Sequence, residues 1–164
     1  MQVFIANIDS ISKNPDEYMA LLSPQDRVRA SAFHNQTRKL QFILGHLMAN
    51  KVGGKHTSIA HKDKFVVVAT ASNASVGIDI ENTTVKRDFV SASAIMGIKT
   101  PKTLQDFYHS FTEFEATYKL SMAPVCTRFI TYGDYLICVT ANHEFAAPRL
   151  RNFDITSISS SNQE

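Results

Sequence analysis

The sequence predicts an α+β protein whose two halves, each of the order strand, helix, strand, strand, form a pseudo-twofold pair. Apolar residues alternate with a period of two in several short segments and recur at helical spacing in two long ones. The same order of segments then occurs twice and restarts at residues 72–74. We therefore expect an N-terminal half over residues 1–72, a C-terminal half over 73–151 and a loose, serine-rich tail over 152–164.

Start and stop signals define the helices of the first half. Asn14-Pro15 and Ser23-Pro24 each place an N-cap residue before a proline at the first helical position, and Gly53-Gly54 ends the longest helix. The expected elements are strands at 2–8, 57–61 and 65–71, and helices at 15–22, 25–33 and 36–52.

In the second half the polar stretch that ends at Pro101 gives no clear pattern, whereas the segments around it do. Gly133-Asp134 lies between two apolar runs and predicts a tight hairpin turn. The expected elements are strands at 75–81, 128–132 and 135–140, and a helix from Lys102 or Thr103 to about Ser121.

Composition excludes several classes of protein. The longest apolar runs, such as Phe65 to Ala69, are far shorter than the roughly 20 residues that cross a bilayer, so we expect no membrane span. Residues 1–5 lack the basic segment of a secretory signal, which favours the cytoplasm. Cys126 and Cys138 have no CxxC spacing and are expected to be reduced core residues.

The charge distribution is more informative than the net charge of +2, which is too small to indicate a nucleic-acid partner. Residues 1–72 carry nine Lys and Arg against five Asp and Glu, whereas residues 73–164 carry eight against ten. The first half could therefore receive phosphates while the second half holds cations.

Two carboxylates share one face of a predicted strand. In Val-Gly-Ile-Asp-Ile-Glu, residues 76–81, alternation places Asp79 and Glu81 together opposite three apolar side chains. Like charges on one sheet surface repel each other, so they need either solvent or a bound cation. Both alternatives, a solvated edge and a cation site, stay open for this segment.

A third carboxylate, Glu115, falls within the apolar stripe of the long second-half helix. An unpaired buried charge is costly, so Glu115 should be protonated, paired with Lys119 one turn away, or bound to a metal. Three carboxylates from a strand and a helix would suit magnesium. The apolar residues of the stripe are Leu104, Phe107, Tyr108, Phe111, Tyr118 and Met122.

These motifs resemble those of the 4′-phosphopantetheinyl transferases, in particular the longer surfactin-synthetase-activating type with two fused halves. Residues 76–81 are similar to the family's V-G-I-D-I-E motif, and residues 111–119 to its W-S-x-K-E-A-x-x-K helix. Upstream, the stretch from Leu22 to Phe33 resembles L-S-P-x-E-R-x-R-x-x-x-F. Gly53-Gly54-Lys55 resembles the G-G-K-P loop, and residues 58–61 resemble N-I-S-H.

The resemblance implies a fold, an activity and a set of site residues. The chain would be a monomeric pseudo-dimer that transfers 4′-phosphopantetheine from coenzyme A to a serine of an apo acyl or peptidyl carrier protein. Magnesium would be the cofactor. The implied roles are magnesium binding by Asp79, Glu81 and Glu115, catalysis by Asp79, Glu115 and the pyrophosphate-side Lys119, and coenzyme A phosphate binding by Arg29, Lys55 and His61.

The sequence also departs from the family pattern, and the departures keep alternatives open. A catalytically impaired relative that binds coenzyme A or a carrier protein without turnover is the main alternative, and a magnesium-dependent nuclease is a second. The general base is not identified, because Ala94 lies in a segment without the family's glutamate. The other departures are Phe111 for tryptophan, Phe114 for lysine, Ala60 for serine, His56 for proline and Gln41 for arginine.

Overall fold

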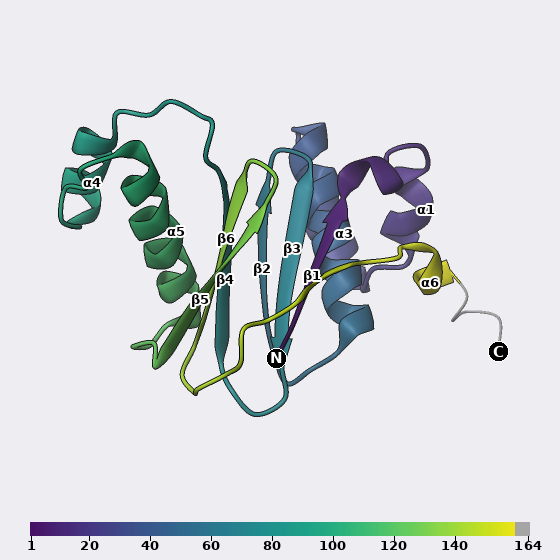
Figure 1. Cartoon of the computed structure of the whole chain (residues 1–164). Coiled ribbons are helices and arrows are strands. Elements are labelled where there is room, and N and C mark those ends of the chain that lie inside the picture. The colour runs from purple at the N-terminus through teal and green to yellow at the C-terminus, as the bar shows by residue number, and fades with distance from the viewer. Residues whose placement is uncertain (160–164) are drawn as a thin grey trace.

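The computed structural model, which describes residues 1–159, is a mixed α+β fold with six α-helices and two β-sheets (Figure 1). The first sheet has the strand order β2-β3-β1-β7 and the second β4-β6-β5. The strands are β1 (Gln2–Asn7), β2 (His56–Lys62), β3 (Phe65–Ala71), β4 (Val76–Asn82), β5 (Cys126–Tyr132), β6 (Tyr135–Ala141) and β7 (Leu150–Asn152). The helices are α1 (Pro15–Ala20), α2 (Pro24–Ser31), α3 (Gln36–Val52), α4 (Phe89–Met96), α5 (Leu104–Leu120) and α6 (Thr156–Ser159), with a 3-10 turn at Ile8–Ser10.

The layers follow the order helix, sheet, sheet, helix. In Figure 1, α3 covers the outer side of the first sheet and α5 the outer side of the second. The inner faces of the two sheets pack against each other through short apolar side chains, which favours close contact between them. This inner core includes Val3, Ile5, Val67, Ala69, Val76, Ile78, Ile80, Ile137 and Val139.

Each sheet contains the same three-strand pattern. The hairpin β2–β3 pairs with β1, and the hairpin β5–β6 pairs with β4, in both cases through the second strand of the hairpin. The registers are equivalent, since Asn7 lies opposite Phe65 and Asn82 lies opposite Tyr135, the first residue of β3 and β6 respectively.

The repetition extends to the hydrogen bonds that follow these strands. Ile8 N donates to Lys64 O and Thr83 N to Asp134 O, both at 2.9 Å. Asn7 Oδ1 accepts from the amide two residues later, and so does Asn82 Oδ1. We call the strands β1, β2 and β3 with their helices the first unit, and β4, β5 and β6 with theirs the second unit. The backbones of the two units follow the same arrangement although the sequence does not repeat.

Most predicted elements are confirmed, and the helix over 36–52 has the expected bounds. Ser23 caps α2 by accepting from Asp26 N, whereas Asn14, the expected N-cap of α1, makes no capping side-chain bond. The polar stretch before Pro101 contains α4, which begins at the N-cap Asp88 and ends at Gly97 in the left-handed conformation.

The loose tail expected from Asn152 is wrong for the residues that the structure describes. Strand β7 pairs in parallel with β1, and Phe153 N donates to Ile5 O at 2.8 Å. Phe153 meets the ring of Phe4 edge-on, and Ile155 is buried. Residues 160–164 lie outside the described part of the chain. Cys126 and Cys138 are free and buried, as expected.

The buried stripe predicted for α5 is confirmed in the first half of the helix and wrong in the second. Its buried residues are Phe107, Tyr108, Thr112, Ala116 and Leu120. Tyr118 and Met122, expected in the buried stripe, are 77% and 45% exposed. The reason is the close approach of α5 to β4 at Gly77, where an added Cβ would lie 2.0 Å from Ala116 O. This contact requires small residues and turns the bulky ones outward.

We predict that Gly77→Ala lowers the free energy of unfolding by roughly 3 kcal/mol, because the methyl group meets helix backbone that cannot move locally. Urea unfolding monitored by circular dichroism would measure the loss. Gly45→Ala is the matched control and should cost less, since its Cβ would lie 2.8 Å from Ile59 Cγ2, a side-chain atom that can shift by a few tenths of an ångström, and not against backbone. Equal losses for the two variants would contradict the explanation.

Candidate functional site

Strand β4 carries its two acidic side chains toward α5. Its alternation buries Val76, Ile78 and Ile80 between the sheets and turns Asp79 and Glu81 to the opposite face, as predicted. Both acidic residues are only 8% exposed. The solvated-edge alternative is therefore wrong, and each carboxylate needs a partner.

Lys119 on α5 is the partner of Asp79. Its Nζ donates to Asp79 Oδ1 at 2.7 Å and to Ile78 O at 3.1 Å. The alternative ion pair between Glu115 and Lys119 does not form. Within the described chain Glu115 has neither a hydrogen bond nor an ion pair, although its charge is close enough to act on Asp79.

The charged form of Asp79 is destabilised by its surroundings. Burial raises the pKa of Asp79 to about 6 in spite of Lys119, and the charges of Glu81 and Glu115 act in the same direction as burial. Its second oxygen, Oδ2, is buried and has no hydrogen-bond partner. A buried carboxylate oxygen without a donor needs an explanation, and a bound cation would supply one.

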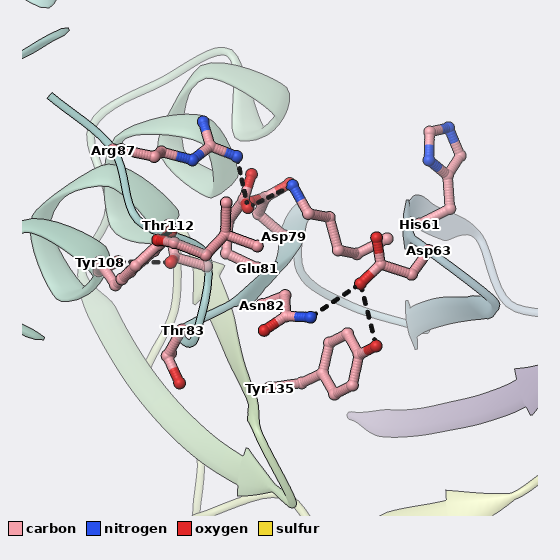
Figure 2. A network of polar contacts seen from close by, with 12 residues as sticks. His61, Asp63, Asp79, Glu81, Asn82, Thr83, Arg87, Tyr108, Thr112 and Tyr135 are labelled. Carbon is pink, nitrogen blue, oxygen red and sulfur yellow. Dashed lines mark hydrogen bonds and ion pairs between the residues drawn. The ribbon is translucent and has the colours of Figure 1, made fainter. Parts of the chain in front are cut away.

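Glu81 is held by two cations that the sequence motifs did not indicate. Its Oε2 lies 2.7 Å from Lys62 Nζ and 3.1 Å from Arg87 Nη2. Figure 2 shows the guanidinium of Arg87 reaching over to Glu81 beside Asp79. Lys62 comes from β2 of the first unit, and Arg87 comes from the loop between β4 and α4. Neither residue shares a helix or strand with Glu81, so the spacing of residues within an element could not indicate these pairs.

The two units meet here along β2 and β4. Ser58 Oγ on β2 accepts from Ile78 N on β4 at 3.2 Å, in addition to the pair between Lys62 and Glu81. The meeting line of β2, β4 and α5, which we call the seam, brings acidic side chains of the second unit against basic side chains of the first.

A second contact point lies at the end of the seam. Asp63, in the turn of the β2–β3 hairpin, accepts from Asn82 Nδ2 at 2.9 Å and from the Tyr135 hydroxyl at 3.0 Å through its Oδ2 (Figure 2). Its backbone oxygen accepts from Gln41 Nε2 at 2.8 Å. The amide of Asn82 and, more weakly, the hydroxyl of Tyr135 lower the pKa of Asp63, so the contact persists in mild acid.

His61 faces α3 on the other side of β2. Arg38 Nη1 lies 2.6 Å from Nε2 and 2.9 Å from Nδ1 of the imidazole. Burial and the charge of Arg38 lower the pKa of His61 to about 4, so its ring is neutral near pH 7. The two side chains line a cavity of about 180 Å³ with Phe33, Gln41, Phe42, His46 and Ile59. The positive charge of this cavity comes from Arg38, which the sequence analysis missed.

The three expected phosphate-binding residues do not come together. Arg29 lies 5.5 Å from the centre of the Phe42 ring, which also lines the cavity beside His61. Lys55 is exposed and precedes β2, six residues before His61, which corresponds to roughly 20 Å along an extended strand. Arg29 therefore contacts a ring that lines the cavity of His61 but does not line the cavity itself, and Lys55 lies near the opposite end of the strand.

The fit of a metal ion to these residues is partial. Among residues 1–159, no three His, Cys, Asp or Glu side chains are grouped closely enough to form a metal site. Within the described residues the buried Asp79 Oδ2 is nevertheless without a donor, and the half-buried side chain of Glu115 makes no ion pair, so both could turn to a cation. Glu81 differs, because its Oε2 already contacts two protein cations.

The sequence matches no known protein-family model and no protein of curated function. The resemblance drawn from the motifs therefore stays a prediction. None of the helices in the described part of the chain combines the length and the apolar character needed to cross a membrane.

We predict that His61 makes the protein less stable in mild acid. An unfolded histidine takes up its proton near pH 6.5 and folded His61 only near 4, so the free energy of unfolding should fall as the pH is lowered through this window. His61→Gln should remove this part of the loss. Urea unfolding at about pH 7 and about pH 5 would measure it.

The exposed His143 offers a control for the titration of histidine in general. His143→Gln should leave the pH dependence of the parent protein unchanged. A His61→Gln protein that loses as much stability as the parent between the two pH values would contradict the assignment.

Proposed function

We propose that this chain transfers the 4′-phosphopantetheine group of coenzyme A to a serine of an acyl or peptidyl carrier protein. The observation that carries the proposal is the seam, where Glu81 of one unit meets Lys62 of the other beside the pair of Asp79 and Lys119, while Arg38 and His61 line a cavity on the other side of β2. A substrate with a diphosphate and a 3′-phosphate needs cations at two places, and the chain supplies both.

The repeated backbone supports a pseudo-twofold relation between the units, which the resemblance implies. The equivalent registers and the equivalent hydrogen bonds after β1 and β4 are difficult to explain by chance. In such a pair, a ligand bound at the seam contacts both units, and equivalent positions of the two units can carry different residues with different roles.

The proposed reaction joins the phosphopantetheine group to the carrier protein and releases the rest of coenzyme A. The serine oxygen of the carrier protein attacks the β-phosphorus of coenzyme A, and the proton of its hydroxyl passes to solvent water. The bond from that phosphorus to the bridging oxygen breaks, and adenosine 3′,5′-bisphosphate departs with the electron pair. Lys119, fixed by Asp79 and Ile78 O, would stabilise the charge that develops on the leaving group.

Magnesium belongs to the proposal as the cofactor. Asp79 and Glu115 would hold it, with Glu81 beside them, and when bound it would neutralise negative charge on the diphosphate. The buried Oδ2 of Asp79, which has no donor, supports this assignment.

A second candidate is a relative that binds coenzyme A or a carrier protein without turnover. The observation that favours it is Phe114, 37% exposed on α5 where the family motif has a lysine. Such a protein would lack one of the cations that assist the departure of the bisphosphate.

One experiment separates the two candidates. The purified chain is incubated with coenzyme A, magnesium and a panel of apo carrier proteins, and each carrier protein is analysed by intact mass. Addition of one phosphopantetheine group to a carrier protein is expected. Coenzyme A binding measured by calorimetry, without any mass increase on the panel, would favour the non-catalytic relative, and the absence of both would overturn the proposal.

We predict that Asp79→Asn and Glu115→Gln each abolish magnesium-dependent transfer while the protein stays folded. Removing one carboxylate weakens cation binding, whereas repulsion among the remaining acidic groups decreases. Initial rates of transfer at several magnesium concentrations would measure this. Glu113→Gln, a neighbouring change of the same kind on α5, is the control and should transfer at the parent rate; full activity of either site variant would exclude the assigned role.

We also predict that Lys119→Ala reduces the transfer rate by roughly 100-fold with little change in coenzyme A affinity, because the lost charge acts mainly in the transition state. Single-turnover rates and calorimetric affinities would separate the two effects. Lys102→Ala, just before α5, controls for the net charge, and a Lys119→Ala protein with parental turnover would show that Lys119 only neutralises Asp79.

A further inference from the structure

Lys62 and Arg87 form a pair of cations fixed on a single carboxylate oxygen. Both reach Oε2 of Glu81, at 2.7 Å and 3.1 Å, from different parts of the chain. Their side chains are 20% and 31% exposed, whereas the side chain of Glu81 is 11% exposed. The carboxylate is thus the covered member of the cluster, and the two cations lie between it and solvent.

Arg87 is positioned more firmly than an ordinary surface arginine. Its guanidinium lies 5.3 Å from the ring centre of Phe111 and 5.9 Å from that of Tyr108. The hydroxyl of Tyr108 donates to Val85 O at 2.6 Å, which fixes the loop that carries Arg87. An arginine held by two rings and a carboxylate loses little freedom when it binds a ligand.

Both cations keep unused donors. Within the described part of the chain, Arg87 donates only through Nη2, so Nε and Nη1 have no acceptor. Lys62 Nζ contacts Glu81 alone and can donate two further hydrogen bonds. These two cations outnumber the carboxylate that they contact, and the neighbouring Asp79 is paired with Lys119, so the cluster of Lys62, Arg87 and Glu81 carries a net positive charge. Partial burial strengthens its attraction for an anion.

We propose that Lys62 and Arg87 bind a phosphate group of a diphosphate substrate, and that Glu81 positions these two cations instead of acting as a metal ligand. A guanidinium fork and an ammonium group suit the oxygens of such a group, and charge-assisted bonds of this kind are the strong ones. The identity of the substrate as coenzyme A rests on the proposed function, whereas the anion site rests on the contacts of Glu81 alone.

The test uses inorganic pyrophosphate as the probe, titrated calorimetrically into the full chain in the presence of EDTA. We expect Lys62→Gln and Arg87→Gln each to weaken pyrophosphate binding by about tenfold or more. Lys64→Gln is the matched control. Lys64 lies on the same hairpin, is 64% exposed and pairs with Asp9, so its change alters the net charge equally without touching the seam.

Two further variants keep the test decisive if a glutamine variant does not fold. Arg87→Lys preserves the charge but loses the fork, so it should also weaken pyrophosphate binding. Glu81→Gln removes a negative charge, which by Coulomb attraction alone would tighten binding. If Glu81 positions the cations, binding instead weakens, and the magnesium concentration that half-activates transfer stays within about twofold of the parent value.

Binding of pyrophosphate that is absent, or equally strong in the parent, Lys62→Gln and Arg87→Gln proteins, would overturn the inference. So would a Glu81→Gln protein that binds pyrophosphate more tightly than the parent. The carrier-protein assay tests the proposed function independently of pyrophosphate binding. Transfer that does not depend on Lys62 and Arg87 would support the proposed function and contradict the anion site. Pyrophosphate binding that depends on these cations, without any transfer, would support the anion site and contradict the proposed function.

Discussion

The site depends on the close approach of α5 to β4 at Gly77. No side chain fits there, because an added Cβ would lie 2.0 Å from Ala116 O and 2.9 Å from Leu120 N. Glu115 precedes Ala116 and Lys119 precedes Leu120, so the same contact fixes both candidate site residues of the helix near Asp79. The glycine two residues before the first carboxylate therefore has a mechanical role, which is to bring the helix within hydrogen-bonding distance of the strand.

Burial of Asp79 and Glu81 creates an electrostatic cost that the fold offsets with cations from three elements. Lys119 comes from α5, Lys62 from β2 and Arg87 from the loop after β4. The offset is incomplete at Asp79, whose pKa stays raised to about 6 and whose Oδ2 lacks a donor. Glu81 is in the opposite position, with two cations on one oxygen. The two carboxylates of one strand face are thus suited to different partners, a cation at Asp79 and an anion next to Glu81.

Features that depend on local sequence could be predicted, and those that depend on contacts between elements far apart in the sequence could not. The alternation of β4 and the bounds of α3 follow from periodicity and end signals, and both are confirmed. The roles of Lys62 and Arg38 depend on which strand and helix lie beside β2, which no pattern within β2 reveals. The buried face of α5 was predicted from its large apolar residues, but the small contact at Gly77 turned Tyr118 outward. Close packing of backbone on backbone leaves no hydrophobic signal in a sequence.

The two units share a backbone arrangement but carry different side chains, which explains how two similar units can form an asymmetric site. The first residue of each hairpin turn has a positive φ, 50° at Asp63 and 56° at Gly133. Glycine adopts this conformation without strain, so Gly133 needs no compensation, whereas an aspartate there costs energy. At Asp63 the cost is offset by hydrogen bonds from Asn82 and Tyr135, both of which belong to the other unit. The side chain of this strained residue is thus hydrogen-bonded by the other unit, and it holds the end of β4 next to Glu81. Joining the two units and orienting the carboxylates of the seam are therefore parts of one set of contacts.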